Sequence, residues 1–398
     1  MKNKKFIVLG ILSITLLTVL IGCGRKSQQP DEITSEVPSE KTAESTVTVE
    51  SNNDFALVDK LYEEEKGNVV VSNTSVNMAL AMLLEGSGGE TQSQLETYLG
   101  HSQEEAKEIN RQLIDTYNNS SDEDLKINIA NSLWSDKDMV IKKEYMALLD
   151  DYFEAEAENL DFSDPQAADK INNWVSEKTN GLIKEIVRAD SLKDMAAVLI
   201  NTVYFHANWV DEYDSAVPGT FNGQDAEMLE HVEDVYFEND NAVAFAKPYN
   251  GNFEFIGILP KNEGEFTLEE LDIDGLLETR TRDYDVATSM PKFKNEYSVS
   301  LSDVLKKSGV ICMFGSDSDL TDISDGFFVS DILHKTYISV DEHGTEAAAA
   351  TSAMVALTSM AESKEVKEVY LDRPFAFMIY DTKNETPLFV GKIVNLAN

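Results

Sequence analysis

The chain has 398 residues, enough to bury a substantial core in one large domain or in two. Its 33 Lys and Arg residues against 72 Asp and Glu residues give a net charge of −39. So acidic a chain lacks the positive surface that contacts phosphates, which excludes nucleic acid as a partner. The charge favours solubility outside the cell and identifies no partner by itself.

The first 22 residues predict a secretory signal peptide. Residues 1–5 are basic, and residues 6–21 form an apolar run too short for a comfortable membrane span. Leu20-Ile21-Gly22-Cys23 is similar to a bacterial lipobox, which implies cleavage before Cys23 and lipidation of its thiol. Two acyl chains, at about 0.8 kcal/mol per buried methylene, would anchor the protein stably. The alternative is a plain signal peptide in which Cys23 has no role.

Residues 23–53 are predicted to be a lipid-anchored tether, followed by one folded domain over residues 54–398. Ser, Gln, Pro, Glu and Thr dominate residues 24–53, and so few apolar side chains cannot offset the entropy of ordering. As a flexible coil this segment spans about 30 Å. We therefore expect secretion across the cytoplasmic membrane, with the domain anchored at the extracellular face or released. Cys312, the other cysteine, is expected to be a buried small hydrophobe rather than a reactive thiol.

Helix and strand patterns occur together in the first half of the domain. Leu57, Leu61 and Tyr62 recur at helical spacing, and Asp164-Pro165 combines an N-cap residue with proline at the first helical position. The expected helices cover residues 55–65, 76–84 and 91–99 and the segment that begins at Pro165, and the expected strands cover residues 69–71, 125–133 and 197–209.

The second half of the domain is predicted to be mostly strands. Helices come early and strands late, without regular strand–helix alternation, so the sequence predicts an α+β fold rather than a doubly wound sheet. No internal repeat is present. The expected strands cover residues 243–248, 253–259, 285–293, 375–380 and 388–394.

An alanine-rich stretch follows a strand-like run at residues 337–340. It begins Asp341-Glu342-His343-Gly344-Thr345-Glu346 and stays small and mostly uncharged through Ala353. Intrinsic propensity favours a helix here. Alternate residues from Thr345 to Leu357 instead line one face of a possible strand, small at first and more apolar later. The local pattern leaves both interpretations open.

Several sequence blocks together resemble the serpin family of serine protease inhibitors. They follow the family order and extend from about residue 54 to the end of the chain. Asn73 and Leu396 depart from the pattern at positions where the family usually has proline. The blocks are Ser72-x-x-Ser75 with Gly86-x-Gly88-Gly89-x-Thr91, Thr179-Asn180-Gly181-Leu182-Ile183-Lys184, Asn201-Thr202-Val203-Tyr204-Phe205 with Trp209, Met290-Pro291-Lys292-Phe293, Asp319-Leu320-Thr321 with Ile323-Ser324, His334-Lys335 through Thr351, Asp372-Arg373-Pro374-Phe375-Ala376-Phe377 and Pro387-Leu388-Phe389-Val390-Gly391-Lys392.

The resemblance implies three β-sheets, eight to nine helices, and an exposed reactive-centre loop in a metastable protein. A target protease would cut the loop and form an acyl-enzyme, and the cut loop would enter the largest sheet as a new strand. The hinge of such a loop needs backbone freedom and small side chains. The residues that match it are Glu342, Gly344, Thr345, Glu346, Ala347, Ala348, Ala349, Ala350 and Thr351.

The resemblance places the cleaved bond about seventeen residues into the loop, between Thr358 and Ser359. Thr358 would suit the shallow apolar pocket of an elastase-like or subtilisin-like serine protease. Cleavage after Leu357 or Met360 stays open and would favour chymotrypsin-like targets. A trypsin-like target would require Lys364 or Lys367.

Four polar residues match the cluster that the family keeps behind the central strands, where hydrogen bonds would hold the sheet closed. His334 is interpreted as a satisfied buried histidine rather than a catalytic base. Trp209 matches the tryptophan at the end of the sheet where the loop first enters, and it also fits a plain core aromatic. The cluster residues are Ser72, Ser75, Asn201 and His334.

Other functional classes fit the sequence less well. Neither a His-Glu-x-x-His pair nor a phosphate-binding loop is present, and Gly86-Ser87-Gly88 lacks the strand–turn–helix context of a nucleophile elbow. A lipid-anchored solute-binding protein would show repeated strand–helix alternation. We therefore predict a monomeric inhibitory serpin with no enzyme activity, cofactor or metal, whose partner is a serine protease. A non-inhibitory serpin acting as carrier or scaffold, or an inhibitor of cysteine proteases, is the alternative.

Overall fold

The computed structural model describes residues 54–118, 124–345 and 364–396. Several sequence predictions lie outside these ranges: the signal peptide, the tether, lipidation of Cys23, the hinge residues 346–351 and the bond between Thr358 and Ser359. Among the described residues, no helix is both long enough and apolar enough to cross a bilayer.

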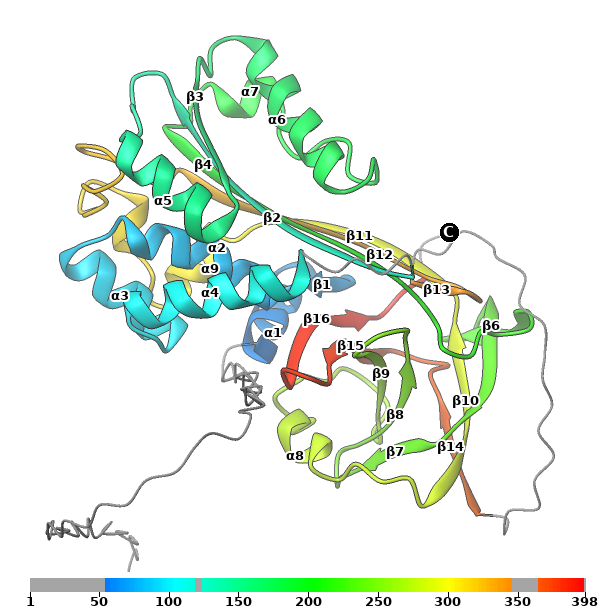
Figure 1. Cartoon of the computed structure of the whole chain (residues 1–398). Coiled ribbons are helices and arrows are strands. Elements are labelled where there is room, and N and C mark those ends of the chain that lie inside the picture. Colours follow the sequence, from blue (N-terminus) through cyan, green and yellow to red (C-terminus); the bar gives the residue numbers. More distant parts are fainter. Residues whose placement is uncertain (1–53, 119–123, 346–363, 397–398) are drawn as a thin grey trace, which may run out of the picture. The chain divides into compact units, whose positions relative to one another are not determined.

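The described residues contain three β-sheets (Figure 1). The predicted α+β architecture with three β-sheets is confirmed. A six-stranded sheet has the order β11-β12-β13-β4-β2-β3, a second six-stranded sheet has the order β1-β16-β15-β9-β8-β7, and a four-stranded sheet has the order β14-β10-β6-β5. The strands are β1 (Val69–Val71), β2 (Leu125–Asp136), β3 (Glu156–Leu160), β4 (Ala197–Asn208), β5 (Val217–Phe221), β6 (Gln224–Glu233), β7 (Val235–Glu238), β8 (Ala242–Pro248), β9 (Phe253–Pro260), β10 (Tyr284–Pro291), β11 (Phe293–Ser300), β12 (Asp331–Val340), β13 (Gly344–Thr345), β14 (Glu365–Tyr370), β15 (Phe375–Asp381) and β16 (Thr386–Ile393).

Nine α-helices occur within the described residues. Four begin at side-chain caps: Ser72 caps α2, Ser102 and Glu105 form a capping box on α4, Asp164 caps α6 with Pro165 at the first helical position, and Asp272 caps α8. The helices are α1 (Asp54–Glu65), α2 (Asn73–Glu85), α3 (Gly89–Leu99), α4 (Gln103–Tyr117), α5 (Lys143–Phe153), α6 (Pro165–Lys178), α7 (Ala189–Leu192), α8 (Ile273–Leu277) and α9 (Ser302–Lys307).

The sheet that contains β4 is covered on both faces, which explains why β4 is apolar along most of its length. A small cluster under α6 and α7 packs on one face and includes Trp134, Ile171 and Val198. The large core, which includes α2, lies on the other face (Figure 1). At the end of α2, a Cβ on Gly86 would lie 2.2 Å from Ile323 Cγ1, so only glycine permits this close approach.

The junction between β4 and β12 changes along its length. Val198–Val203 of β4 pairs in parallel with Asp331–Thr336 of β12. Further along, β13 lies between the two strands and pairs antiparallel with both. We call this boundary the seam, its directly paired part the closed half, and the part that holds β13 the open half.

One predicted strand proved to be two. The sequence predicted a single strand over residues 285–293, but β10 ends at Pro291 and β11 starts at Phe293 in a different sheet. Proline lacks the N–H that would continue the ladder, so the chain changes sheets there. The sequence analysis also did not predict the helices α4 and α5 or the strands β3, β5, β6, β7 and β14.

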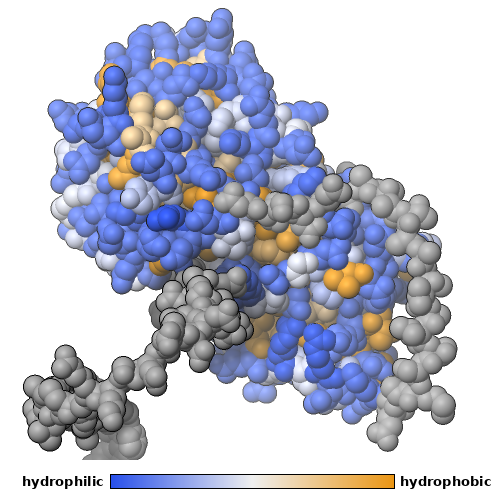
Figure 2. All heavy atoms as spheres, in the orientation of Figure 1, coloured by the Kyte–Doolittle hydropathy of each residue, from blue (hydrophilic) through white to orange (hydrophobic). Residues whose placement is uncertain are grey.

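The surface of the described domain is mostly hydrophilic in the view of Figure 2, where hydrophobic residues form small separate patches. This agrees with the net charge of −39. The apolar residues of the central strands are therefore buried between the layers rather than displayed to solvent.

Candidate functional site

The predicted hinge begins in the open half of the seam. The Asp341 side chain accepts hydrogen bonds from the backbone of His343 (2.9 Å) and Gly344 (3.3 Å), which reverses the chain after β12. Gly344 and Thr345 then pair with Asn208 and Ala207 of β4. The first hinge residues are thus a buried strand of the sheet, whereas the sequence analysis expected an exposed loop.

The close fit of β13 explains its residue types. A Cβ on Gly344 would lie 2.1 Å from the carbonyl oxygen of Ala207, which excludes any larger residue. Thr345 is 1% exposed, and its hydroxyl lies 2.6 Å from the hydroxyl of Tyr249. The requirement for small, uncharged side chains at these positions is therefore already present in the intact chain.

Backbone hydrogen bonds hold the turn before β13 against the end of β4. Trp209 donates from its backbone to His343 O (2.9 Å) and from its indole Nε1 to Asp341 O (3.0 Å). The backbone of Tyr213 donates to Glu342 O (2.9 Å). Trp209 therefore lies beside the turn before β13 and contacts it through two donors.

Two ion pairs add to this contact. Lys292 lies 2.9 Å from Glu342, and Glu212 lies 2.8 Å from His343. Burial opposes ionisation of Glu342, but hydrogen bonds from Lys292 and the backbone outweigh it and lower the pKa of Glu342. The hydrogen bond to Glu212 raises the pKa of His343. The turn is thus held by one permanent charge pair and one that depends on pH.

A cluster of aromatic side chains packs against the open half of the seam. Trp209 stacks on Tyr249 with ring centroids 4.1 Å apart, and Tyr213 meets Trp209 edge to face. The buried ammonium of Lys247 lies 4.3 Å from the Tyr213 ring centroid and 2.9 Å from Glu233. Because its charge is paired in this way, Lys247 can remain under the rings without an unpaired buried cation.

The closed half of the seam contains the predicted polar cluster, which the structure brings together. Asn201 Nδ2 donates to Ser75 O (2.8 Å), to the Ser75 hydroxyl and to Asn131 Oδ1 (2.6 Å). His334 Nδ1 lies 2.6 Å from Asn201 Oδ1. Ser72 takes part through its backbone N–H, which donates to His334 Nε2 (3.1 Å), while its side chain caps α2.

The protonation state of His334 follows from these contacts. Nε2 accepts from Ser72, so Nδ1 carries the proton and donates to Asn201. Complete burial lowers the pKa of His334 to about 3. The ring is neutral at physiological pH, and it connects α2 to both β4 and β12. These contacts agree with the interpretation of His334 as a satisfied buried histidine.

Two further predictions, on Cys312 and on the trypsin-like alternative, can be compared with the structure. Cys312 is only partly buried, and its Sγ lies 3.1 Å from Gln94 Nε2, so the expectation of a buried cysteine was wrong. Lys367 lies inside β14 and pairs with Glu365 at 3.1 Å. A bond next to Lys367 is therefore part of a sheet, which disfavours cleavage there, whereas Lys364, the other lysine of the trypsin-like alternative, lies before β14.

Sequence reasoning missed several members of the site. Asn131 lies opposite Asn201 in the β2–β4 register, and a polar residue inside a buried strand was a detectable signal. Lys292 lies within the quoted Met290-Pro291-Lys292-Phe293 block, but nothing in that block indicated Glu342 as its partner. Tyr249 and Glu212 had no local signal, because only the fold brings them to the hinge.

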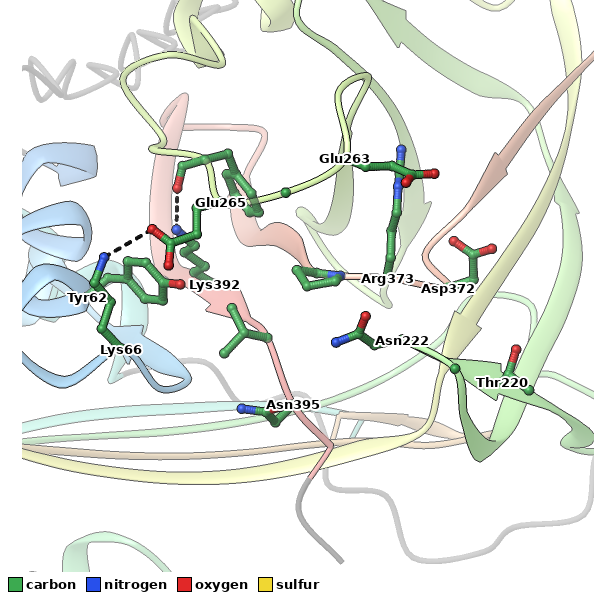
Figure 3. A pocket seen from close by; sticks show the side chains of 15 residues that line it. Tyr62, Lys66, Thr220, Asn222, Glu263, Glu265, Asp372, Arg373, Lys392 and Asn395 are labelled. Carbon is green, nitrogen blue, oxygen red and sulfur yellow. Dashed lines mark hydrogen bonds and ion pairs between the residues drawn. The ribbon is translucent and has the colours of Figure 1, made fainter.

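A separate pocket of about 690 Å³ lies between α1, the end of β16 and the loop after β9 (Figure 3). Lys392 is fully buried there, with Nζ donating to Phe266 O and lying 3.4 Å from the Tyr62 ring centroid. Burial lowers the pKa of Lys392 to about 8. Lys66 at the rim pairs with Glu265 at 3.2 Å. The walls carry both signs of charge, and the described residues include no cluster suited to a metal ion.

Comparisons with known proteins agree with this architecture. A family model described as serpin (serine protease inhibitor) matches residues 50–396. An uncharacterized serpin-like protein of Thermococcus kodakarensis is 32% identical over 425 residues, covering 97% of this chain and 98% of the relative. The chain belongs to the serpin family.

Two solved structures show the same fold. The thermophilic serpin tengpin in its native state aligns with a TM-score of 0.77 and 32% identity, covering 86% of this chain and 93% of tengpin. Human thyroxine-binding globulin complexed with thyroxine aligns with a TM-score of 0.78 and covers 88% of this chain and 98% of that protein, but at 23% identity it shows the fold alone. The family supports a protease-inhibitor type of function in general and no catalytic activity of its own.

Proposed function

We propose that this serpin is an inhibitory member of the family that traps extracellular serine endopeptidases as a suicide substrate. The observation that carries the proposal is the seam: β13 already occupies its open half, and six residue pairs join β4 to β12 in its closed half. Such a boundary is prepared to accept a longer strand from the same segment.

The proposed reaction uses the chemistry of the target protease. Its serine attacks the carbonyl of the reactive bond, the new amine leaves with the proton that the protease supplies, and an ester joins the two proteins. The freed loop then extends β13 along β4 and separates the closed half of the seam. The ester moves with the loop, and hydrolysis fails once the protease active site is distorted.

The energetics favour insertion once the loop is cut. Separating β4 from β12 breaks their direct backbone pairing, while an inserted strand pairs with both neighbours at each residue. Cutting the loop removes the tether that keeps β13 short. The polar cluster around Asn201 and His334 lies at the closed half, so we propose that it controls how readily the strands part.

The target class follows from the predicted bond. Thr358 among small and apolar residues supports an elastase-like or subtilisin-like target, and cleavage after Leu357 or Met360 would support a chymotrypsin-like one. A carrier or scaffold serpin is the second candidate, because thyroxine-binding globulin has the same fold. The small residues that fit the narrow site of β13 favour the inhibitor.

We also propose that Cys23 is lipidated and holds the domain at the extracellular face of the membrane. The Leu20-Ile21-Gly22-Cys23 block and the polar tether support this. In cells fed a radiolabelled fatty acid, the wild-type protein should carry label and partition with membranes. Cys23→Ser should do neither, and label on that variant would contradict the proposal.

The test of inhibition uses pancreatic elastase, neutrophil elastase and subtilisin, each mixed with the full-length protein and run on denaturing gels. We expect a covalent complex with at least one protease. Its mass should equal the sum of the two proteins minus the C-terminal fragment that cleavage releases. If every protease cuts the loop and dissociates, the inhibitor proposal fails and the carrier remains.

A further inference from the structure

The outer face of the four-stranded sheet carries an exposed apolar strip. Val366 on β14 and Val232 on β6 are 60% and 61% exposed, and Tyr370 is 39% exposed. These three are half of the six large hydrophobic side chains that are exposed within the described residues. Their concentration on one sheet face needs an explanation, because isolated exposed hydrophobic residues are ordinary and grouped ones mark contact surfaces.

The strand registers place these side chains on the same face. Val366, Glu368 and Tyr370 alternate along β14, with Lys367 and Val369 directed to the opposite side. Glu368 pairs with Ala287 of β10, and Ala287 pairs with Val232 of β6. The strip therefore crosses three strands. A groove of about 710 Å³ follows it, lined by Met228, Glu230, Val232, Ala287, Ser289 and Tyr370.

The border of this strip is acidic. Glu230 and Glu368 lie exposed on the same face, and Asp372 lines the groove. Lys367 is directed to the other side, where its ammonium lies 4.6 Å from the Tyr284 ring centroid. A second copy of this chain would bring like charges together, which opposes self-association. An apolar surface with a basic rim is the complementary partner.

The position of the strip relative to the predicted reactive bond indicates which protein would be this complementary partner. β14 starts at Glu365, and Val366 follows the predicted bond at Thr358 by eight residues, a reach of at most about 27 Å. Val232 lies two strands further, about 10 Å away. A protease of about 220 residues has a radius of gyration of about 17 Å and is roughly 40 Å across. A protease engaged at the predicted bond is therefore large enough to reach this face.

We propose that the strip formed by Val232, Ala287, Val366 and Tyr370 is a docking surface for the target protease, and that it selects proteases with a basic rim around their cleft. The inference rests on the proposed inhibitory function. The loop alone supplies a short contact, whereas a typical stable interface buries about 1,600 Å². The strip supplies additional area, and the acidic border accelerates encounter with a basic partner.

The experiment measures the second-order rate of covalent complex formation by the full-length protein. Val232→Ser/Val366→Ser removes two side chains of the strip. Val140→Ser/Ile311→Ser is the matched control, because these residues are 63% and 57% exposed and lie near α5 and α3, away from the four-stranded sheet. We expect the first variant to react at least fivefold more slowly with a basic protease, and the control to stay within twofold of wild type. Both should keep the wild-type stoichiometry of inhibition, because neither alters the hinge.

A second pair of variants tests the charge. Glu230→Lys/Glu368→Lys should lose the decrease of rate with added NaCl, while Glu63→Lys/Glu144→Lys on α1 and α5 should keep most of it. If Val232→Ser/Val366→Ser and Glu230→Lys/Glu368→Lys both react at the wild-type rate, the docking proposal is wrong and the inhibitory function is unaffected. Absence of any covalent complex with wild type would overturn the inhibitory function, and the docking surface would then lose its occupant.

Discussion

The two halves of the seam hold the same pair of strands by different means. In the open half, aromatic rings, backbone donors and two ion pairs hold β13 and its turn in place. In the closed half, a fully buried polar network joins β4 and β12 to α2. The two ion pairs of the turn are partly exposed and therefore individually weak, whereas a fully buried network is costly to disrupt. If the proposed insertion occurs, we therefore expect the closed half to limit how far the loop moves along the seam.

The largest effect on inhibition is expected when β13 is prevented from occupying the open half of the seam. Thr345→Arg places a long charged side chain at a site that is 1% exposed, so β13 should leave the seam. The variant should become a substrate, with at least a tenfold higher stoichiometry of inhibition by titration. Thr116→Arg, on the exposed face of α4, is the matched control and should inhibit normally. Unchanged inhibition by Thr345→Arg would mean that the hinge is assigned wrongly.

A smaller effect is expected from weakening the closed half. Asn201→Ala leaves the His334 and Asn131 side chains with unpaired polar atoms, at a cost of about 3 kcal/mol. This corresponds to a Tm of the intact protein lower by about 4 °C. Asn110→Ala on α4, equally buried but away from the seam, should shift Tm by about 1 °C. The Asn201 variant should also convert spontaneously to an inactive form faster than wild type. Equal conversion rates would show that the polar network does not control separation of the strands at the seam.

Acid pH should destabilise the closed half of the seam, and alkaline pH should loosen the open half. The pKa of His334 is about 3 in the native protein and about 6.5 when unfolded, so the unfolded chain binds the extra proton. Stability of the closed half is therefore present above pH 6.5 and falls by about 2 kcal/mol between pH 6.5 and pH 5. Calorimetry should show this slope in wild type and a smaller one in His334→Gln. Equal slopes would contradict the buried neutral histidine.

The alkaline effect on the open half is smaller. The pKa of His343 is raised by Glu212, so its contribution is present below the unfolded pKa and is lost as pH rises through the native pKa. Fluorescence of Trp209, whose indole donates to Asp341, should report loosening of the turn on the alkaline side. His343→Gln should lack this transition, and a transition that persists in that variant would have another origin.

Sequence patterns predicted much of the fold and only part of the site. The apolar run at residues 197–209, the cap at Asp164 and the polar residues at Ser75, Asn201 and His334 carry local or motif signals. Contacts between segments that are far apart in the sequence carry no such signal. Nothing in the sequence around Tyr249 or Lys292 indicates that they meet Thr345 and Glu342, because those contacts exist only once three sheets have assembled.

The alanine-rich stretch is described only at its start, where Gly344 and Thr345 form a strand between β4 and β12. Glycine and threonine are weak helix formers, so this pairing does not decide between helix and strand for the alanines that follow, which lie outside the described residues. The same pairing explains why Gly344 is small, since a larger residue would contact the backbone of Ala207.

The most direct test compares thermal unfolding of the intact protein with that of the protein cut once within the loop by limited proteolysis. Insertion of the freed strand into the seam predicts a Tm higher by more than about 10 °C, because many new backbone pairs and buried side chains are gained. An unchanged or lower Tm after a single cut in the loop would contradict the account, because it would show that the seam does not accept the cut strand.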